Sequence, residues 1–198
     1  MLASNVQLKV GWVSKCFLAF LKKTTSVVLK TTIYTKNAFV VKVSRSRLVG
    51  LLGLLHSHLL CQYTSLADIL VYDNPSKLYR FAVTYSLLSL AFNSRLAVCV
   101  YTNPGLPVAT SCYVYAAAAW LEREAWDLYG IFFVRHPDLR KILTDYGFNH
   151  HPLRKDFPLA GYKEGVYSQK ENRTLYRGVK LTQAYRVFAF KGAWLKYD

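Results

Sequence analysis

Acidic side chains are almost missing from the first 121 residues of this chain. That part holds two of the 11 Asp and Glu residues, Asp68 and Asp73, against 12 Lys and Arg, and the whole chain has a formal net charge of +15. Few internal ion pairs can form there, so the cations need an external counter-charge from nucleic acid, an anionic membrane surface or an acidic protein. The simpler alternative is a set of solvated lysines that keeps the chain soluble.

Cysteine is scarce and scattered, which argues against two further classes. None of the four cysteines, Cys16, Cys61, Cys99 and Cys112, stands in a CxxC pair. Zinc and iron–sulfur sites favour such pairing. A disulfide framework belongs to small secreted domains, whereas this chain of 198 residues is 53% hydrophobic and can build a core. We expect four reduced, mostly buried thiols.

Long membrane-spanning runs are also lacking. Residues 48–67 and 96–121 carry no formal charge, but polar side chains interrupt the first, and Asn, Pro and Gly break the second. A spanning helix needs about 20 predominantly apolar residues. Both stretches are therefore predicted to be buried elements of a folded domain, and we expect no transmembrane helix.

Motifs for enzyme chemistry are missing as well. No glycine-rich phosphate loop, G-x-S-x-G elbow or HExxH pattern occurs. His136, His150 and His151 lack a spacing that would fix a metal site, and adjacent histidines in an extended chain point to opposite faces. No catalytic, cofactor-binding or metal-binding residue is therefore predicted.

A helix rich in Ala, Glu and Leu is predicted within residues 113–133, ending near Gly130. Glu122 and Glu124 are two apart on it and cannot form a carboxylate pair. Arg123 and Asp127 are four apart and can pair on the helix surface, and an exposed pair of this kind stabilises a helix by about 0.3–0.5 kcal/mol.

The remaining patterns predict one α+β domain with a mixed β-sheet, in the order α-β-β-α-β-β-β and then the helix, followed by a long extended C-terminal tail. The order begins with an amphipathic N-terminal helix, which we interpret as a retained part of the chain. The second helix is nearly all apolar, is capped by Ser44 or Ser46, runs on through Leu59 and is expected to be buried. The expected elements are an N-terminal helix in 1–25, a hairpin in 25–44 turning at Lys36-Asn37, the apolar helix in 44–60 and strands in 65–73, 78–91 and 95–102. The expected domains are an extension (1–25), an α+β domain (26–135) and a partner-wrapping tail (136–198).

The tail from His136 onward is dense in proline, glycine and aromatic residues. Pro137 can open one helical turn, and the rest to about Tyr185 is expected to be extended and irregular. A disordered linker would lack the aromatics, so we interpret the tail as a segment that drapes over another protein, whose surface offsets the entropy of ordering it.

Within the tail, an extended "PLRKDFP" places Arg154 and Asp156 on one side and Lys155 on the other. A guanidinium beside a carboxylate suits bidentate pairing across an interface, with aromatic anchors around it. The alternative is that these pairs fix the tail to its own domain. Residue chemistry alone leaves both alternatives open.

The stretch "WLEREAWDLYGIFFVRHPDLRKILTDYGFNHHPLRKDFPLAGYKE", residues 120–164, resembles the signature of the NADH dehydrogenase subunit 9 family, the 30-kDa-type subunit of respiratory complex I. Weaker likeness covers "RFAVTYSLLSLAFNSRLAV" and "LTQAYRVFAFKGAW". One departure is His150, which stands where the family has glycine; a non-glycine there requires negative φ or costs strain.

The resemblance implies an α+β domain and a non-catalytic core subunit of the peripheral arm, in the quinone module of proton-pumping NADH:ubiquinone oxidoreductase. Such a subunit supports assembly and electron transfer from NADH to ubiquinone and packs against the hydrogenase-large-subunit-like subunit. Flavin and iron–sulfur clusters are expected in other subunits, and no cofactor in this chain. The implied location is the matrix side of the mitochondrial inner membrane, peripheral to the bilayer and without nucleic acid.

From the resemblance and the residue chemistry together, two sets of positions are predicted. The partner interface comprises His136, Asp138, Arg140, Asp145, Tyr146, Phe148, His151, Arg154, Asp156, Phe157 and Tyr162. The structural signature comprises Glu122, Arg123, Glu124, Trp126, Asp127 and Gly130. Two alternatives are a basic RNA-binding protein of ribosomal type, which the lack of basic runs disfavours, and a stand-alone enzyme using His150 or His151.

Overall fold

The structure, a computed structural model, describes residues 28–35, 38–184, 186 and 188, with side chains from Phe39 onward. The chain divides into two compact units, residues 1–157 and 158–198. The helix predicted for residues 1–25 lies outside the described residues. Residues 136–157 belong to the first unit, whereas the sequence suggested that the tail begins at His136.

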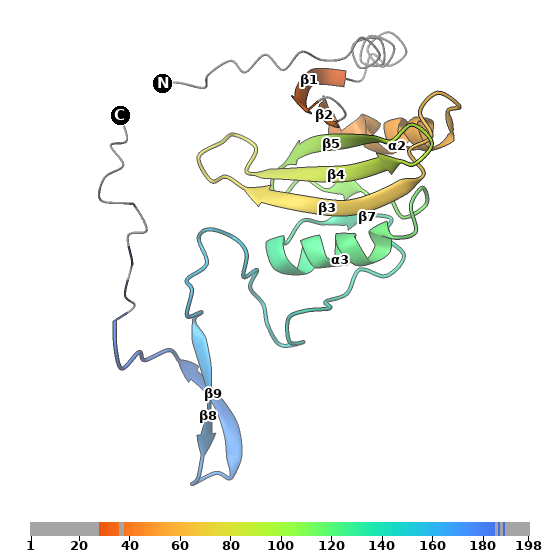
Figure 1. Ribbon diagram of the computed structural model, residues 1–198. Coiled ribbons are helices and arrows are strands. Elements are labelled where there is room, and N and C mark those ends of the chain that lie inside the picture. The colour runs from red at the N-terminus through yellow and green to blue at the C-terminus, as the bar shows by residue number, and fades with distance from the viewer. Residues whose placement is uncertain (1–27, 36–37, 185, 187, 189–198) are drawn as a thin grey trace, which may run out of the picture. The chain divides into compact units, whose positions relative to one another are not determined.

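A five-stranded mixed sheet is the largest element of the first unit (Figure 1). Its spatial order is β1-β2-β5-β4-β3, with β2 and β5 parallel and the other neighbours antiparallel. The two strands of the predicted hairpin pair as β1 and β2, whereas its predicted turn at residues 36–37 lies outside the described residues, and the sheet is mixed as expected. The strands are β1 (Val28–Thr35), β2 (Ala38–Val43), β3 (Ser65–Asp73), β4 (Phe81–Ser89) and β5 (Ser94–Thr102).

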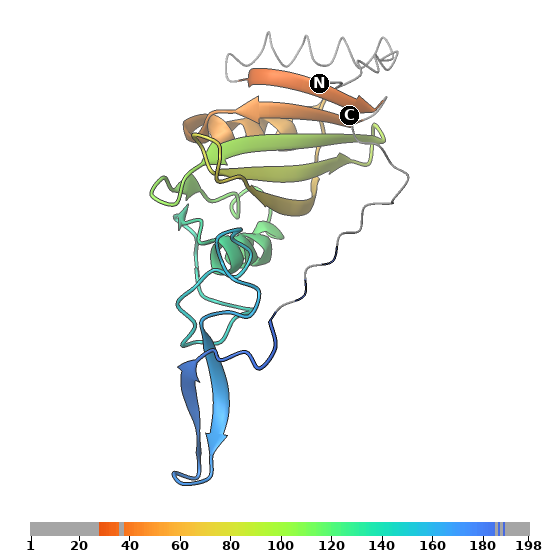
Figure 2. The ribbon, with the colours of Figure 1, turned by 90° about the vertical axis from the view of Figure 1, so that its left-hand side faces the viewer.

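The core lies on one face of this sheet. Buried and half-buried side chains alternate along β4, because successive strand residues point to opposite faces. Its buried set is Phe81, Val83, Tyr85, Leu87 and Ser89. Buried side chains of helices α2 (Leu48–Ser57) and α3 (Ala118–Tyr129) join the same core cluster, and Figure 2 shows the sheet turned by 90°.

Helix α2 is buried as predicted but shorter than predicted. It follows a 3₁₀ turn, η1 (Arg45–Arg47), whose N-cap Ser44 makes no side-chain capping bond. The helix ends at Ser57, because His58 takes an extended conformation. Leu59, expected on the buried stripe, is instead 78% exposed, since the chain turns there to bring Cys61 into the core.

Two short strands flank α3, and no sequence pattern predicted them. They are β6 (Val108–Ala109) and β7 (Phe133–Val134), which pair in parallel. Two residues are too few for a periodic pattern to show. Their pairing brings together the segments that precede and follow α3.

The second unit contains an antiparallel hairpin, β8 (Lys163–Ser168) and β9 (Arg173–Gly178). An irregular extended segment was expected here, so this part of the prediction was wrong. The alternation of side chains over six residues and the turn at Asn172, whose φ is +48°, favour the hairpin. None of the helices that the structure describes is long and apolar enough to cross a membrane.

Candidate assembly surface

Residues 136–157, here called the strap, cross α3 within the first unit. The helical turn expected after Pro137 does not form. Instead, the backbone N–H groups of Ile142, Leu143 and Thr144 all point at one carboxylate oxygen of Asp127, at 3.3, 2.9 and 2.9 Å. A carboxylate oxygen that accepts hydrogen bonds from three successive backbone N–H groups holds the chain in a turn, and this turn is incompatible with a helix.

Asp127 is the anchor of this contact. Its side chain is fully buried, and burial alone would raise its pKa. The hydrogen bonds from Thr144 and the neighbouring backbone outweigh burial and lower the pKa. Lys141 lies 3.8 Å away and supplies a partial counter-charge.

The predicted surface pair of Arg123 and Asp127 is wrong. Arg123 donates from Nε to the carbonyl oxygen of Arg140 at 3.1 Å, and its guanidinium lies 4.9 Å from the ring centroid of Trp120. The reason is burial: Asp127 faces the strap with no exposed surface, so a solvent-facing pair on α3 cannot form.

The strap also occupies the C-terminal end of α3. The last carbonyls of a helix have no partner within the helix. Here Leu153 donates its N–H to the carbonyl of Leu128 at 3.2 Å, and Arg154 donates from Nε to the carbonyl of Tyr129 at 2.6 Å. The cation at the negative end of the helix dipole is favourable as well.

Gly130 makes this close approach possible. It has φ +74°, the left-handed conformation at which helices commonly end. A Cβ at this position would lie 2.3 Å from Nη2 of Arg154 and 2.5 Å from Nε2 of His151. His151 in turn lies 2.9 Å, through Nδ1, from the carbonyl of Asp127, and its burial lowers its pKa.

The end of the strap is joined to the sheet by an ionic cluster. Arg80 donates to both carboxylate oxygens of Asp73, at 2.7 and 2.8 Å, and to Asp156 at 2.9 Å. Asp73, with 2% of its side chain exposed, also accepts the N–H of Lys155 at 2.8 Å. The Arg80 hydrogen bonds lower the pKa of both carboxyls. The guanidinium of Arg154 lies 5.6 Å from the Phe81 ring centroid.

These contacts answer the question about "PLRKDFP". The segment forms successive turns, so the extended arrangement of Arg154, Lys155 and Asp156 was wrong. Its charged groups bond within their own domain. The turns form because the carbonyls at the end of α3 and the carboxylate of Asp73 accept hydrogen bonds from the backbone and side chains of this segment. A partner contact by Arg154 or Asp156 stays a prediction.

The other predicted interface positions divide by exposure. Tyr146 is 91% exposed and Tyr162 is 52% exposed. Asp138 and Arg140 form a surface ion pair of 2.9 Å. Asp145 accepts the N–H of Tyr146 at 2.8 Å. The remaining positions make contacts within the first unit. The ring centroids of Phe148 and Phe157 lie 6.0 Å apart, and His136 and His151 each contact a backbone carbonyl of α3.

Glu122 lies in the first half of α3, away from the C-terminal end that the strap occupies. It is fully buried and accepts hydrogen bonds from the hydroxyl of Thr110 at 2.5 Å and from the N–H and hydroxyl of Ser111 at 2.7 and 2.6 Å. The sequence analysis missed Thr110 and Ser111 as partners of Glu122. The available signal was that these two hydroxyl residues stand shortly before the helix. Of the other signature residues, Trp126 packs partly buried against the core and Glu124 is exposed.

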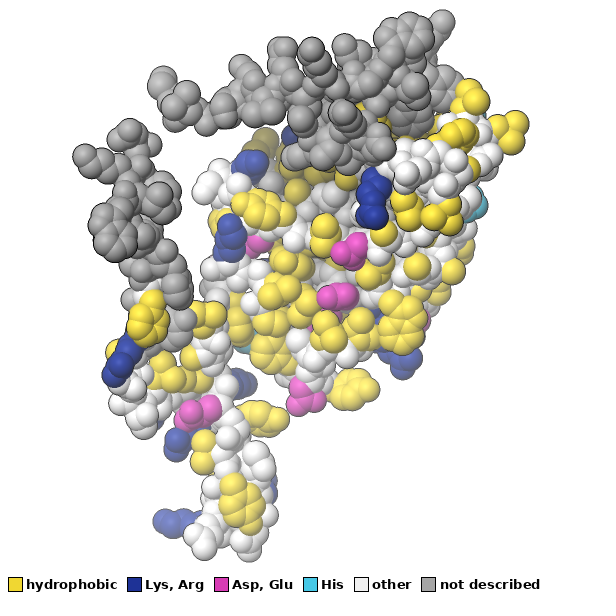
Figure 3. All heavy atoms as spheres, viewed as in Figure 1, with side chains coloured by type: hydrophobic (Ala, Val, Ile, Leu, Met, Phe, Trp, Pro, Cys, Tyr) yellow, Lys and Arg dark blue, Asp and Glu magenta, His cyan; other side chains and the backbone are white. Residues whose placement is uncertain are grey.

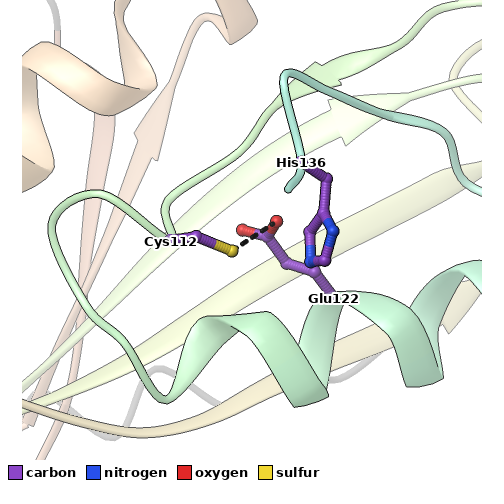
Figure 4. Close-up of side chains that lie close together, drawn as sticks. All are labelled: Cys112, Glu122 and His136. Atoms are coloured by element: carbon purple, nitrogen blue, oxygen red, sulfur yellow. Dashed lines mark hydrogen bonds between the residues drawn. The ribbon is translucent and has the colours of Figure 1, made fainter. Parts of the chain in front are cut away.

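Cys112 and His136 lie beside Glu122, and the possible ligand atoms of the three lie within 4.8 Å of one another (Figure 4). Sequence analysis did not group them. The Cys112 thiol lies 3.6 Å from Glu122 Oε2, and burial raises its pKa. His136 contacts the carbonyl of Ala119 through Nε2 at 3.1 Å and accepts from the N–H of Asp138 through Nδ1 at 3.2 Å. Every ligand atom is thus engaged, which favours a polar core over a metal centre.

Comparison with known proteins identifies relatives over most of the chain. The family model described as "Respiratory-chain NADH dehydrogenase, 30 Kd subunit" matches residues 41–163. NADH-ubiquinone oxidoreductase subunit 9 of Reclinomonas americana is 43% identical over 162 residues, covering 82% of this chain and 79% of that protein. An NADH-quinone oxidoreductase subunit of Maricaulis maris is 47% identical over 154 residues, covering 78% and 77%.

A solved structure shares the fold. A chain of the membrane-bound sulfane sulfur reductase, an archaeal respiratory membrane complex, superposes with a TM-score of 0.66 over 89% of this chain and 100% of that one. The two chains are 19% identical, so this likeness speaks for the fold alone. The family match and the relatives above 40% identity go further: this chain belongs to the family of the 30 kDa subunit of respiratory-chain NADH dehydrogenase.

Proposed function

We propose that the chain is a non-catalytic assembly subunit of NADH:ubiquinone oxidoreductase, placed in the quinone module of its peripheral arm. The complex oxidises NADH and reduces quinone, and this chain contributes part of the frame. The names of its relatives, one from Reclinomonas americana and one described as mitochondrial in Candida maltosa, support the complex and a mitochondrial setting. The matrix side of the inner membrane and the hydrogenase-like partner subunit belong to the same proposal.

The hairpin β8–β9 carries the proposal. A two-stranded hairpin alone is marginally stable in water. Most side chains of this one are exposed, including Tyr167 at 64% and Tyr176 at 71%. The register places both tyrosines on one face, with Gly165 opposite Tyr176. An aromatic face of this kind on a small element is typical of a surface that a partner covers.

Charge agrees with a protein partner. Between Pro158 and Ala184 the chain has five Lys and Arg against two Asp and Glu. Glu164 pairs with Arg177 at 2.6 Å, and Glu171 pairs with Arg173 at 2.5 Å. Lys163, Lys170 and Lys180 belong to no ion pair of the described residues, so an acidic partner surface would complement them.

The test compares assembly with turnover in cells that make the complex. The double variant Tyr167→Ser/Tyr176→Ser should reduce the amount of assembled complex several-fold on a native gel. NADH:quinone turnover per assembled complex should stay unchanged, because no reacting group is removed. Tyr113→Ser, which replaces a tyrosine that is 75% exposed on the first unit, is the matched control. Normal abundance with abolished turnover would contradict the scaffold role.

The alternatives have no support among these observations. The relatives belong to respiratory complexes, and the RNA-binding hypothesis gains nothing from them. His150 packs against the rings of Phe148 and Phe157 at 5.9 and 5.8 Å, and His151 lies against α3. Both histidines therefore have structural contacts that explain them without catalysis.

A further inference from the structure

Two surface turns lie side by side at one end of the sheet. One precedes β3 and the other joins β4 to β5. The antiparallel register pairs Ser65, the first residue of β3, with Leu88 near the end of β4, which brings the turns together. The hydroxyls of Tyr63 and Ser94 lie 2.9 Å apart and tie them.

Each turn presents two large apolar side chains to solvent. Leu59 and Leu60 are 78% and 63% exposed on the first turn, and Leu90 and Phe92 are 72% and 52% exposed on the second. We call these four residues the leucine patch. Figure 3 shows hydrophobic side chains gathered at the end of the first unit where α2 ends. Clustered exposed apolar side chains mark interaction sites far more often than single ones do.

The turns are shaped in advance. Gln62 has φ +46° and Asn93 has φ +45°, so each turn contains a non-glycine residue in the left-handed region. For Gln this conformation is uncommon and costs energy. Buried Cys61 and Tyr63 hold the first turn in place from below. A surface fixed in this way binds at a reduced ordering cost.

The charge around the patch defines its occupant. Residues 44–67 and 89–102 contain no acidic side chain, and Arg95 stands exposed directly after the second turn, paired in register with Leu88. A second copy of this chain would bring the same cation and a net charge of +15. An anionic membrane favours clusters of several Lys or Arg, whereas Arg95 is the one cation in residues 58–64 and 89–102.

We propose that the leucine patch docks an amphipathic segment of another subunit, whose apolar side chains cover the patch and one of whose carboxylates faces Arg95. This inference rests on the proposed function, because it takes the chain to be part of a multi-subunit complex. It adds a docking surface on the first unit that is separate from the hairpin. The chain would then contact the rest of the complex through two different elements.

Site-specific photocrosslinking in the purified complex tests this. A benzophenone amino acid replaces Leu60, and in a control it replaces Leu78, which is 86% exposed at the opposite end of β4. We expect the Leu60 probe to crosslink to an acidic amphipathic segment of another subunit, and the Leu78 probe not to reach that segment. Arg95→Glu should lower the crosslink yield several-fold, whereas Arg95→Lys should preserve it.

The outcomes separate the two proposals. A crosslink to lipid, to a second copy or to this chain itself would overturn the docking proposal, as would no crosslink from a chain that is present in the complex. A yield that Arg95→Glu leaves unchanged would overturn the acidic character of the partner. If the wild-type chain does not co-purify with the complex at all, the proposed function fails instead.

Discussion

Arg80 and Asp73 form a bidentate ion pair between the ends of β3 and β4, with both carboxylate oxygens within 2.8 Å of guanidinium nitrogens. Asp73 is also where the strap ends, through the N–H of Lys155. One buried carboxylate therefore joins the sheet, the β3–β4 loop and the strap.

Asp73→Asn should destabilise the protein by about 3 kcal/mol, near the lower limit for breaking a buried pair, because 20% of the Arg80 side chain is exposed. Asp156→Asn is the matched control. It removes the second carboxylate that pairs with Arg80, but the Asp156 side chain is 60% exposed, so the free energy of unfolding should fall by less than about 1 kcal/mol. Urea unfolding of the full chain measures both variants. Equal losses would contradict Asp73 as the anchor.

Gly130→Ala should detach the strap from the end of α3. The left-handed conformation costs alanine about 1–2 kcal/mol, and the new methyl group would overlap Arg154 and His151. Gly147→Ala is the control, because a Cβ there meets nothing within 4 Å and its φ is ordinary. Limited proteolysis should cut Gly130→Ala within residues 140–157 at least several-fold faster than wild type, and Gly147→Ala at the wild-type rate. Equal rates would show that the strap is held elsewhere.

Stability should fall in two stages as the solution is acidified. The pKa of His151 is lowered in the folded state, so its contribution is present above about pH 6.5 and declines as the unfolded chain takes up a proton below that. The pKa of Asp73 is also lowered, so its contribution is present above the unfolded pKa of about 3.9 and is lost as pH falls through the folded pKa. Urea midpoints measured from pH 8 to pH 3 would show both stages. His151→Gln should remove the first and Asp73→Asn should weaken the second; unchanged profiles would contradict the assignment.

Periodicity alone predicted most of the sheet, because β3, β4 and β5 carry alternating or continuous apolar runs. Turn residues mark where each of these runs begins and ends. The strap was harder to predict, since Asp127, Asp73 and the carbonyls of α3 decide its path, and each of these contacts joins residues at least 15 apart in sequence. Arg123 and Asp127 show the limit clearly: their spacing predicts a surface pair, and burial of Asp127 overrides it. The hairpin was not predicted because the glycines and aromatic residues of residues 158–178 obscure its two-residue alternation.

The polar cluster around Glu122 should not respond to metal ions. Both its carboxylate oxygens accept hydrogen bonds from Thr110 and Ser111, and the nitrogens of His136 are engaged, so a metal would have to break several bonds to enter. Zinc or a chelator should leave the thermal midpoint of the full chain within about 1 °C. Glu122→Gln should lower that midpoint by several degrees, because the amide group can accept through only one of its two positions and cannot receive all three donors. A rise in the midpoint with zinc that Cys112→Ser abolishes would show instead that the cluster is a metal site.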